Sequence, residues 1–107
     1  TPNRWYMKDA EYIIFGRKGP AKAINDCGSK TVLEFDNVRG KSHPTEKPVD
    51  LLSHLILNST KPDDLVLDPF MGTGSCAVAA RKTGRRFIGY EIDHTYFNTA
   101  KERLNDM

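Results

Sequence analysis

Two glycines in the second half of the chain lie where a backbone could approach a ligand closely. Gly72 and Gly74 belong to the stretch DPFMGTGS, which follows a short apolar run and precedes a segment of helical composition. Glycine suits such a turn because a Cβ would clash with the ligand or with the turn itself. The helix that follows would present unpaired N–H groups to a carboxylate or a phosphate. The stretch therefore predicts a nucleotide-binding turn.

Two acidic residues frame this turn. Asp68 ends the apolar run before it, and Glu91 follows the next apolar run along the chain. A carboxylate at the end of that second strand can accept hydrogen bonds from both hydroxyls of a ribose. Gly72, Gly74 and Ala77 also satisfy the GxGxxA pattern of dinucleotide-binding folds. Spacing alone therefore leaves NAD and an adenosyl cofactor as alternatives.

The elements that would position these residues follow from the spacing of apolar side chains. After Pro48, apolar residues recur at helical intervals on one face, and Pro62 limits the far end of that helix. The predicted order is a helix from Pro48, a strand at 65–67, a helix over 75–83, a strand at 86–90 and a helix over 94–106. A strand, a helix and a strand joined by short turns form a parallel pair with a right-handed crossover. The fold class is therefore α/β, with a Rossmann-like, doubly wound sheet.

Two further strands are expected nearer the N-terminus. Residues 12–15 (YIIF) form a short β-prone run with a turn after it. Residues 31–35 (TVLEF) form the one strand-like run within a connecting loop that is rich in Gly, Asn, Asp and Ser. Both runs are therefore predicted as short strands.

Composition and charge set limits on the class of protein. The 107 residues are 38% hydrophobic and 28% charged, with a net charge of +2, which permits nucleic-acid binding but does not indicate it. Cys27 and Cys76 lack the spacing of a zinc site or a disulfide framework, and Cys76 is expected to be a buried, reduced thiol. The longest apolar stretches are too short to cross a membrane, and the cytoplasm is the expected compartment.

Three motifs together resemble one family of enzymes. DPFMGTGS (68–75) is similar to the cofactor motif of DNA N6-adenine and N4-cytosine methyltransferases, and HPTEKP (43–48) is similar to their HPT-Q/E-KP motif. GYEID (89–93) resembles their acidic ribose-binding motif. With HPTEKP ahead of the cofactor strand, the order resembles the circularly permuted β group. The resemblance covers residues 41 to about 107.

The resemblance implies a binding site for S-adenosylmethionine. Thr45 and Lys47 would reach the methionine end of the cofactor, Glu91 would bind the ribose, and Ile92 would pack near the adenine. The implied cofactor-binding residues are Thr45, Lys47, Asp68, Pro69, Phe70, Gly72, Gly74, Ser75, Glu91 and Ile92. The implied reaction is methyl transfer to adenine N6 or cytosine N4 of double-stranded DNA. A bacterial or phage-encoded restriction-modification system is the implied setting.

The resemblance also divides this single domain into three regions. Residues 1–20 are expected to be a strand region before the recognition segment, residues 21–42 a short loop or recognition segment, and residues 43–107 the S-adenosylmethionine-binding region. The choice between adenine and cytosine stays open, as does the target sequence.

The catalytic motif of the family has no counterpart in these residues. That motif is Asp, Asn or Ser followed by Pro-Pro and an aromatic residue, and no Pro-Pro pair occurs here. Since the motif lies upstream in the permuted group, we expect a C-terminal portion that is inactive alone, and Thr1 is interpreted as a cut or processed end. No catalytic residue and no metal ligand is assigned.

Two other functions remain open, a truncated non-catalytic remnant that binds DNA or a partner, and an NAD-binding domain. An exposed sheet edge is expected to be covered by a second copy or by a missing N-terminal half.

Overall fold

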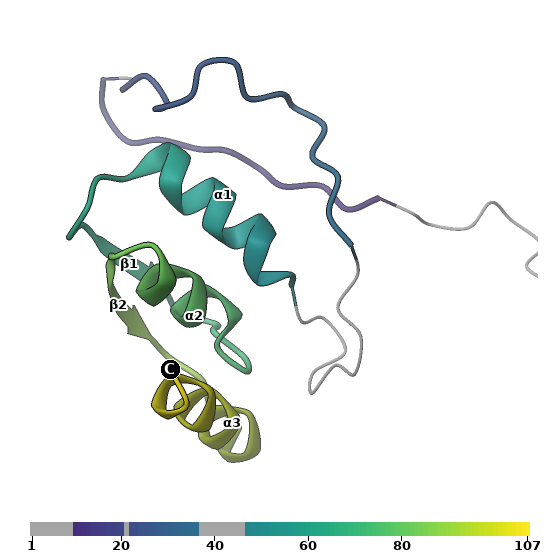
Figure 1. The fold of residues 1–107 in the computed structure, drawn as a ribbon, viewed down its shortest axis with the longest axis vertical. Helices are drawn as coiled ribbons and strands as arrows, with labels where there is room; N and C mark the ends of the chain where they lie inside the picture. The colour runs from purple at the N-terminus through teal and green to yellow at the C-terminus, as the bar shows by residue number, and fades with distance from the viewer. Residues whose placement is uncertain (1–9, 21, 37–46) are drawn as a thin grey trace, which may run out of the picture.

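The regular secondary structure follows the predicted order from residue 49 onward. The computed structural model describes residues 10–20, 22–36 and 47–107. Its elements are α1 (Val49–Ser59), β1 (Leu65–Asp68), α2 (Ser75–Lys82), β2 (Arg86–Gly89) and α3 (His94–Asn105) (Figure 1). Pro48 occupies the N-cap of α1 rather than its first turn, and Gly84 adopts a left-handed φ of 76° shortly after α2. The pattern of apolar residues therefore predicted these five elements to within a few residues.

The two strands form a parallel pair with α2 as the crossover. Leu65 pairs with Arg86 and Asp68 with Gly89. The backbone contacts continue beyond the strands, where Met71 N donates to the carbonyl oxygen of Tyr90 at 2.9 Å. The carboxyl ends of both strands consequently meet at the turn that precedes α2. This α/β unit is the predicted Rossmann-like arrangement in partial form, with a sheet of two strands.

Helix α2 lies at the centre of the packing because its side chains are small. Ala77, Ala79 and Ala80 are almost completely buried, and alanine combines high helix propensity with close approach of neighbouring elements. Ile56 of α1 packs on the same cluster. The surrounding half-buried apolar residues are Val49, Leu52, Val66, Cys76 and Phe87. The core therefore joins α1 to the sheet through α2.

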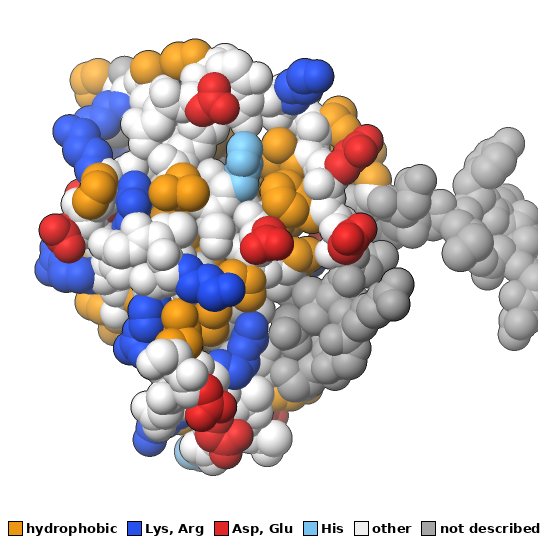
Figure 2. Space-filling view, in the orientation of Figure 1, with side chains coloured by type: hydrophobic (Ala, Val, Ile, Leu, Met, Phe, Trp, Pro, Cys, Tyr) orange, Lys and Arg blue, Asp and Glu red, His pale blue; other side chains and the backbone are white. Residues whose placement is uncertain are grey.

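The opposite face of the sheet stays exposed among the described residues. Side chains alternate along both strands, and the exposed positions are Leu65, Leu67, Arg86 and Ile88; Tyr90, directly after β2, is also exposed. A doubly wound sheet has helices on both faces, so the described residues show one covered face of the predicted arrangement. Figure 2 shows apolar side chains among interspersed acidic and basic ones on the visible face of the molecule.

The two strands predicted near the N-terminus are wrong. Residues 12–15 and 31–35 have no regular secondary structure, and Tyr12 and Ile14 are 97% and 95% exposed. A strand needs a hydrogen-bonded neighbour, and the described residues give neither run one. In Figure 1 these segments follow irregular paths near α1.

A loop residue caps the C-terminal end of α1. Asn25 Nδ2 donates to the carbonyl oxygens of Leu57 and Thr60 at 2.7 and 2.8 Å, and Asn25 N donates to Asn58 O at 2.9 Å. The last carbonyls of a helix have no partner within the helix, so these bonds supply one.

None of the helices within residues 10–20, 22–36 and 47–107 is long and apolar enough to span a bilayer.

The structure distinguishes two glycines that both have left-handed backbones. Gly74 has a φ of 87°, and a Cβ there would lie 2.8 Å from Ala100 Cβ, whereas a Cβ at Gly84 would meet nothing within 4 Å. Alanine at either position would have to adopt a left-handed backbone conformation, which costs roughly 1–2 kcal/mol. We expect Gly84→Ala to lower the free energy of unfolding by about 1 kcal/mol, and Gly74→Ala by at least about twice as much because of the added clash. Urea denaturation measures both, and equal losses would contradict close packing of α3 on the turn.

Candidate functional site

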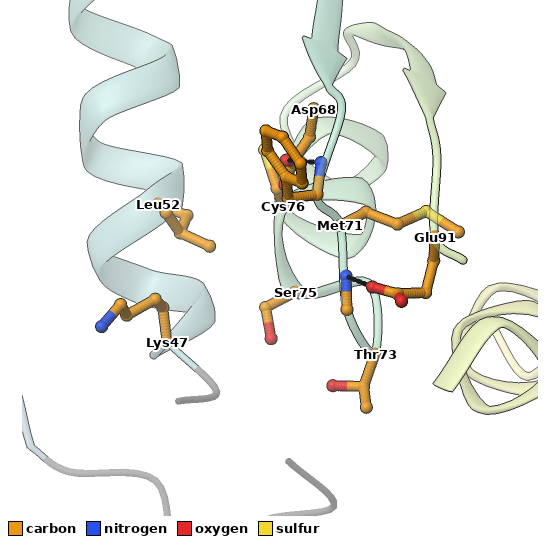
Figure 3. Close-up of a pocket in the computed structure, with 10 residues that line it drawn as sticks. Lys47, Leu52, Asp68, Met71, Thr73, Ser75, Cys76 and Glu91 are labelled. Atoms are coloured by element: carbon orange, nitrogen blue, oxygen red, sulfur yellow. Dashed lines mark hydrogen bonds between the residues drawn. The ribbon is translucent and has the colours of Figure 1, made fainter. Parts of the chain in front are cut away.

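A cavity of about 400 Å³ lies beside the carboxyl ends of the two strands (Figure 3). Lys47 and Leu52 line it from the α1 side, and the turn between β1 and α2 lines it from the opposite side together with Glu91. Small-molecule sites usually occupy about 300–1,000 Å³ and combine apolar walls with a few polar groups. The cavity has this size and this mixture of lining residues.

Glu91 joins the glycine turn to the chain that follows β2. Gly72 N donates to Glu91 Oε1 at 2.9 Å, the bond drawn as a dashed line in Figure 3, and Asp93 N donates to Glu91 Oε2 at 2.8 Å. Each carboxylate oxygen has a second lone pair that can accept a further hydrogen bond. Glu91 therefore has a fixed position at the cavity and retains the capacity to accept bonds from a ligand.

Asp68 shapes the beginning of the same turn. Its Oδ1 accepts a hydrogen bond from Phe70 N at 3.0 Å, two residues further on. Such a contact stabilises a turn directly after a strand. Asp68 is half-buried and lines the cavity, while Phe70 lines it with a side chain that is 87% exposed. The described cavity thus has two carboxylates on its strand side, those of Asp68 and Glu91.

The side chain of Lys47 extends away from the turn, as Figure 3 shows. Its Nζ forms an ion pair with Glu11 Oε2, and both side chains are largely exposed. Exposed ion pairs contribute about 0–1 kcal/mol, so this contact can exchange for another at little cost. Lys47 is thus close enough to line the cavity without directing its charge into it in this conformation.

Cys76 borders the cavity from the first turn of α2. Burial, and to a smaller extent the negative charge of Asp68, together raise the pKa of its thiol from 9.0 to about 11. The thiol is half-buried rather than fully buried as the sequence suggested, and it is free, as expected. At neutral pH it is therefore protonated and a poor nucleophile.

The structure brings together most of the residues predicted for the site. Those that line the cavity are Lys47, Asp68, Phe70, Gly72, Ser75 and Glu91. Pro69, Gly74 and Ile92 are not among its lining residues, and Ile92 is 96% exposed. Thr45 lies outside the described residues. The cofactor-binding roles of all ten predicted residues stay predictions.

Sequence reasoning did not select four further lining residues. These are Leu52, Met71, Thr73 and Cys76. Met71 and Thr73 alternate with the glycines of the turn. Their position within the DPFMGTGS motif was therefore a signal that could have identified them as lining residues. Leu52 belongs to the apolar stripe of α1, which indicates a buried face but not which residue of that face meets a cavity.

Comparison with protein families gives one matching family model. It describes the DNA methylases that act at N6 and N4 positions, and it matches residues 4–102. Type II methyltransferase M2.LlaDCHI from Lactococcus lactis subsp. cremoris is 34% identical over 120 residues, which covers 95% of this chain and 44% of that protein. Type II methyltransferase M2.DpnII from Streptococcus pneumoniae is 38% identical over 120 residues, with 94% and 44% coverage. The chain thus spans less than half the length of these two relatives.

A solved structure is similar over much of the same region. The crystal structure of the M1.HpyAVI–SAM complex has 38% sequence identity and a TM-score of 0.67, and the match covers 77% of this chain and 42% of that one. The similarity therefore extends from the sequence to the fold of the matched part.

The raised pKa of Cys76 predicts slow alkylation in the folded protein. At pH 8 we expect iodoacetamide to modify it about 100-fold more slowly than in urea, because a pKa two units higher leaves about 100-fold less thiolate. The folded-state rate should still rise about tenfold per pH unit between pH 8 and 10. Peptide mass spectrometry of a Cys27→Ser variant assigns the signal to Cys76. A rate that levels off near pH 9 would refute the shift.

Proposed function

The chain belongs to the family of N6-adenine/N4-cytosine DNA methyltransferases, and we propose that its cavity binds S-adenosylmethionine. The observation that carries the proposal is the hydrogen bond between Gly72 N and Glu91 Oε1. This bond joins the cofactor-like turn to the acidic residue expected to bind a ribose, at the edge of one cavity. The cavity lies at the carboxyl ends of parallel strands, which is where open α/β sheets generally bind ligands.

The charges and shape of the cavity suit this cofactor. When bound, S-adenosylmethionine supplies a methyl group on a positively charged sulfur. Two carboxylates, those of Asp68 and Glu91, line the strand side of the cavity and would favour a cation by direct electrostatic attraction. Gly72 has a left-handed φ of 55°, which favours glycine, and as a glycine it leaves the turn without a side chain where the turn faces the cavity.

The proposed roles follow the order of the residues along the cavity. Thr45 and Lys47 would contact the methionine end, with Lys47 exchanging its exposed ion pair with Glu11 for the carboxylate of the cofactor. Glu91 would accept hydrogen bonds from the ribose hydroxyls, and Ile92 would cover the adenine with its exposed side chain. The turn residues Asp68, Phe70, Gly72 and Ser75 would form the wall between these ends, while Pro69 and Gly74, which do not line the cavity, would hold the shape of the turn.

The proposed reaction of the whole protein is methyl transfer to adenine N6 or cytosine N4 in double-stranded DNA. The chain holds the donor side of that reaction in its region 43–107. Since these 107 residues contain no Pro-Pro pair, we propose that the acceptor side, which must hold an extruded base, comes from sequence outside them. The order of HPTEKP before the cofactor strand supports membership of the circularly permuted β group. On this proposal the chain alone transfers no methyl group.

The proposal extends to how the uncovered sheet is completed. The exposed side chains of Leu67, Ile88 and Tyr90 form an apolar face on the described sheet, and apolar faces of this kind are usually packed against another element. We propose that a second copy of the chain or the remaining half of the methyltransferase covers this face. In a type II restriction-modification setting, that completed assembly would bind the DNA.

The cofactor proposal predicts a specific loss of affinity on changing Glu91. Glu91→Gln removes the charge and leaves one of two backbone N–H groups without its acceptor, so binding of S-adenosylmethionine should weaken about 10- to 100-fold. Titration calorimetry measures this loss. Glu102→Gln, the same change at an exposed position of α3, is the matched control and should bind as the unmodified chain does.

NAD serves as the competing ligand in the same titration. Binding of NAD in place of S-adenosylmethionine would overturn the proposal in favour of a dinucleotide site. Equal affinity of the Glu91→Gln and Glu102→Gln variants for S-adenosylmethionine would show that Glu91 does not hold the ribose.

A further inference from the structure

One side chain of α3 reaches across to the glycine turn. Arg103 lies in the last turn of that helix, and its Nη1 donates to the carbonyl oxygen of Thr73 at 2.9 Å. The same nitrogen lies 3.3 Å from Thr73 Oγ1 and 3.2 Å from Ser75 Oγ. The guanidinium therefore contacts both residues that flank Gly74.

The groups that Arg103 contacts are buried. Thr73 is 3% exposed and Ser75 is 7% exposed. A buried polar group without a partner is costly, so the guanidinium meets a need that water cannot readily meet there. Because its N–H group occupies a lone pair of each hydroxyl oxygen, the hydroxyl hydrogens of Thr73 and Ser75 must point elsewhere. Both residues line the cavity (Figure 3), so their hydroxyl groups lie at its wall, within reach of a ligand that binds there.

A second contact of α3 supports the same turn. Ala100 lies three residues before Arg103, on the same face of the helix, and is fully buried. Its Cβ and Cα fill the space that a Cβ at Gly74 would occupy. Helix α3 thus holds the turn at Gly74 by packing and at Thr73 and Ser75 by hydrogen bonds.

We propose that Arg103 is a positioning residue that sets the conformation of the turn at residues 73–75 before a ligand binds. It acts through Thr73 and Ser75, whose hydroxyl groups it orients toward the cavity. For its effect on cofactor affinity, this inference rests on the proposed function. Its effect on the turn itself does not, and can be measured without any ligand.

The test compares two arginines that join the same pair of helices. Arg81 of α2 donates from Nη1 to the carbonyl oxygen of Leu104 at 2.6 Å, so it ties α2 to α3 without contacting the turn. Arg103→Met and Arg81→Met therefore remove similar charges and similar α2–α3 links. Only Arg103→Met releases the turn.

The first measurement is amide hydrogen exchange of the ligand-free chain. The N–H groups of Gly72 and Gly74 report on the turn because they donate to Glu91 Oε1 and to the carbonyl oxygen of Met71. We expect Arg103→Met to speed their exchange at least about tenfold relative to Ala80 within α2, and Arg81→Met to leave that ratio unchanged. Equal ratios in the two variants would overturn the proposal.

The second measurement is the dissociation constant for S-adenosylmethionine. We expect about tenfold weaker binding for Arg103→Met, partial recovery for Arg103→Lys, and no change for Arg81→Met. If the unmodified chain binds no S-adenosylmethionine, the proposed function fails for this chain while the exchange data still decide the role of Arg103. If Arg103→Met does not fold, Thr73→Val and Arg103→Lys carry the exchange test, and unchanged exchange in both would refute the inference.

Discussion

The site depends on a carboxylate that accepts hydrogen bonds from two backbone N–H groups. Glu91 binds Gly72 N on one side and Asp93 N on the other, so one side chain joins the turn after β1 to the segment after β2. Hydrogen bonds to an ionised acceptor are about twice as strong as those between neutral groups. The parallel pairing of β1 with β2 brings these two segments together, and the Glu91 bonds determine how they lie. The same group that holds the turn is the one proposed to meet the ribose.

The turn is supported on its other side by α3, which explains why both glycines are present. Gly72 leaves the turn open toward the cavity, whereas Gly74 makes room for Ala100 of α3. The spacing of the two glycines resembles a ligand-binding signature, yet the second glycine has a reason within the folded chain that needs no ligand. The two glycines of one motif can therefore have different causes, one the approach of a ligand and the other the packing of a helix.

The sequence predicted those elements whose formation depends on residues close together in the chain. Apolar residues at helical spacing indicated α1 and α3, and the short apolar runs on either side of an alanine-rich segment indicated the parallel pair. Residues 12–15 have an equally β-prone composition and form no strand, because pairing depends on a neighbour that composition does not reveal.

The candidate site shows the same limit. The family resemblance selected residues of the turn and Glu91, which are contiguous or follow a strand end. All of these except Pro69 and Gly74 line the cavity. It did not reveal that Glu91 bonds Gly72, nor that Arg103, far along the chain, contacts Thr73 and Ser75. These contacts arise from the direction in which α3 returns across α2, a property of tertiary packing that no local pattern contains.

Most residues that form the cavity wall lie close together in the sequence, and this has an evolutionary consequence. Among the described residues, those that line the cavity lie from Asp68 to Glu91, within one strand–turn–helix–strand unit and the segment directly after it, apart from Lys47 and Leu52. Together with α3, which follows β2 directly and supports the turn, such a unit can be inherited as a single block, because these segments are consecutive in the chain. Gene rearrangements that move other segments to the opposite end of a chain would leave this block intact. A cavity wall built in this way depends little on where the remaining segments stand in the chain.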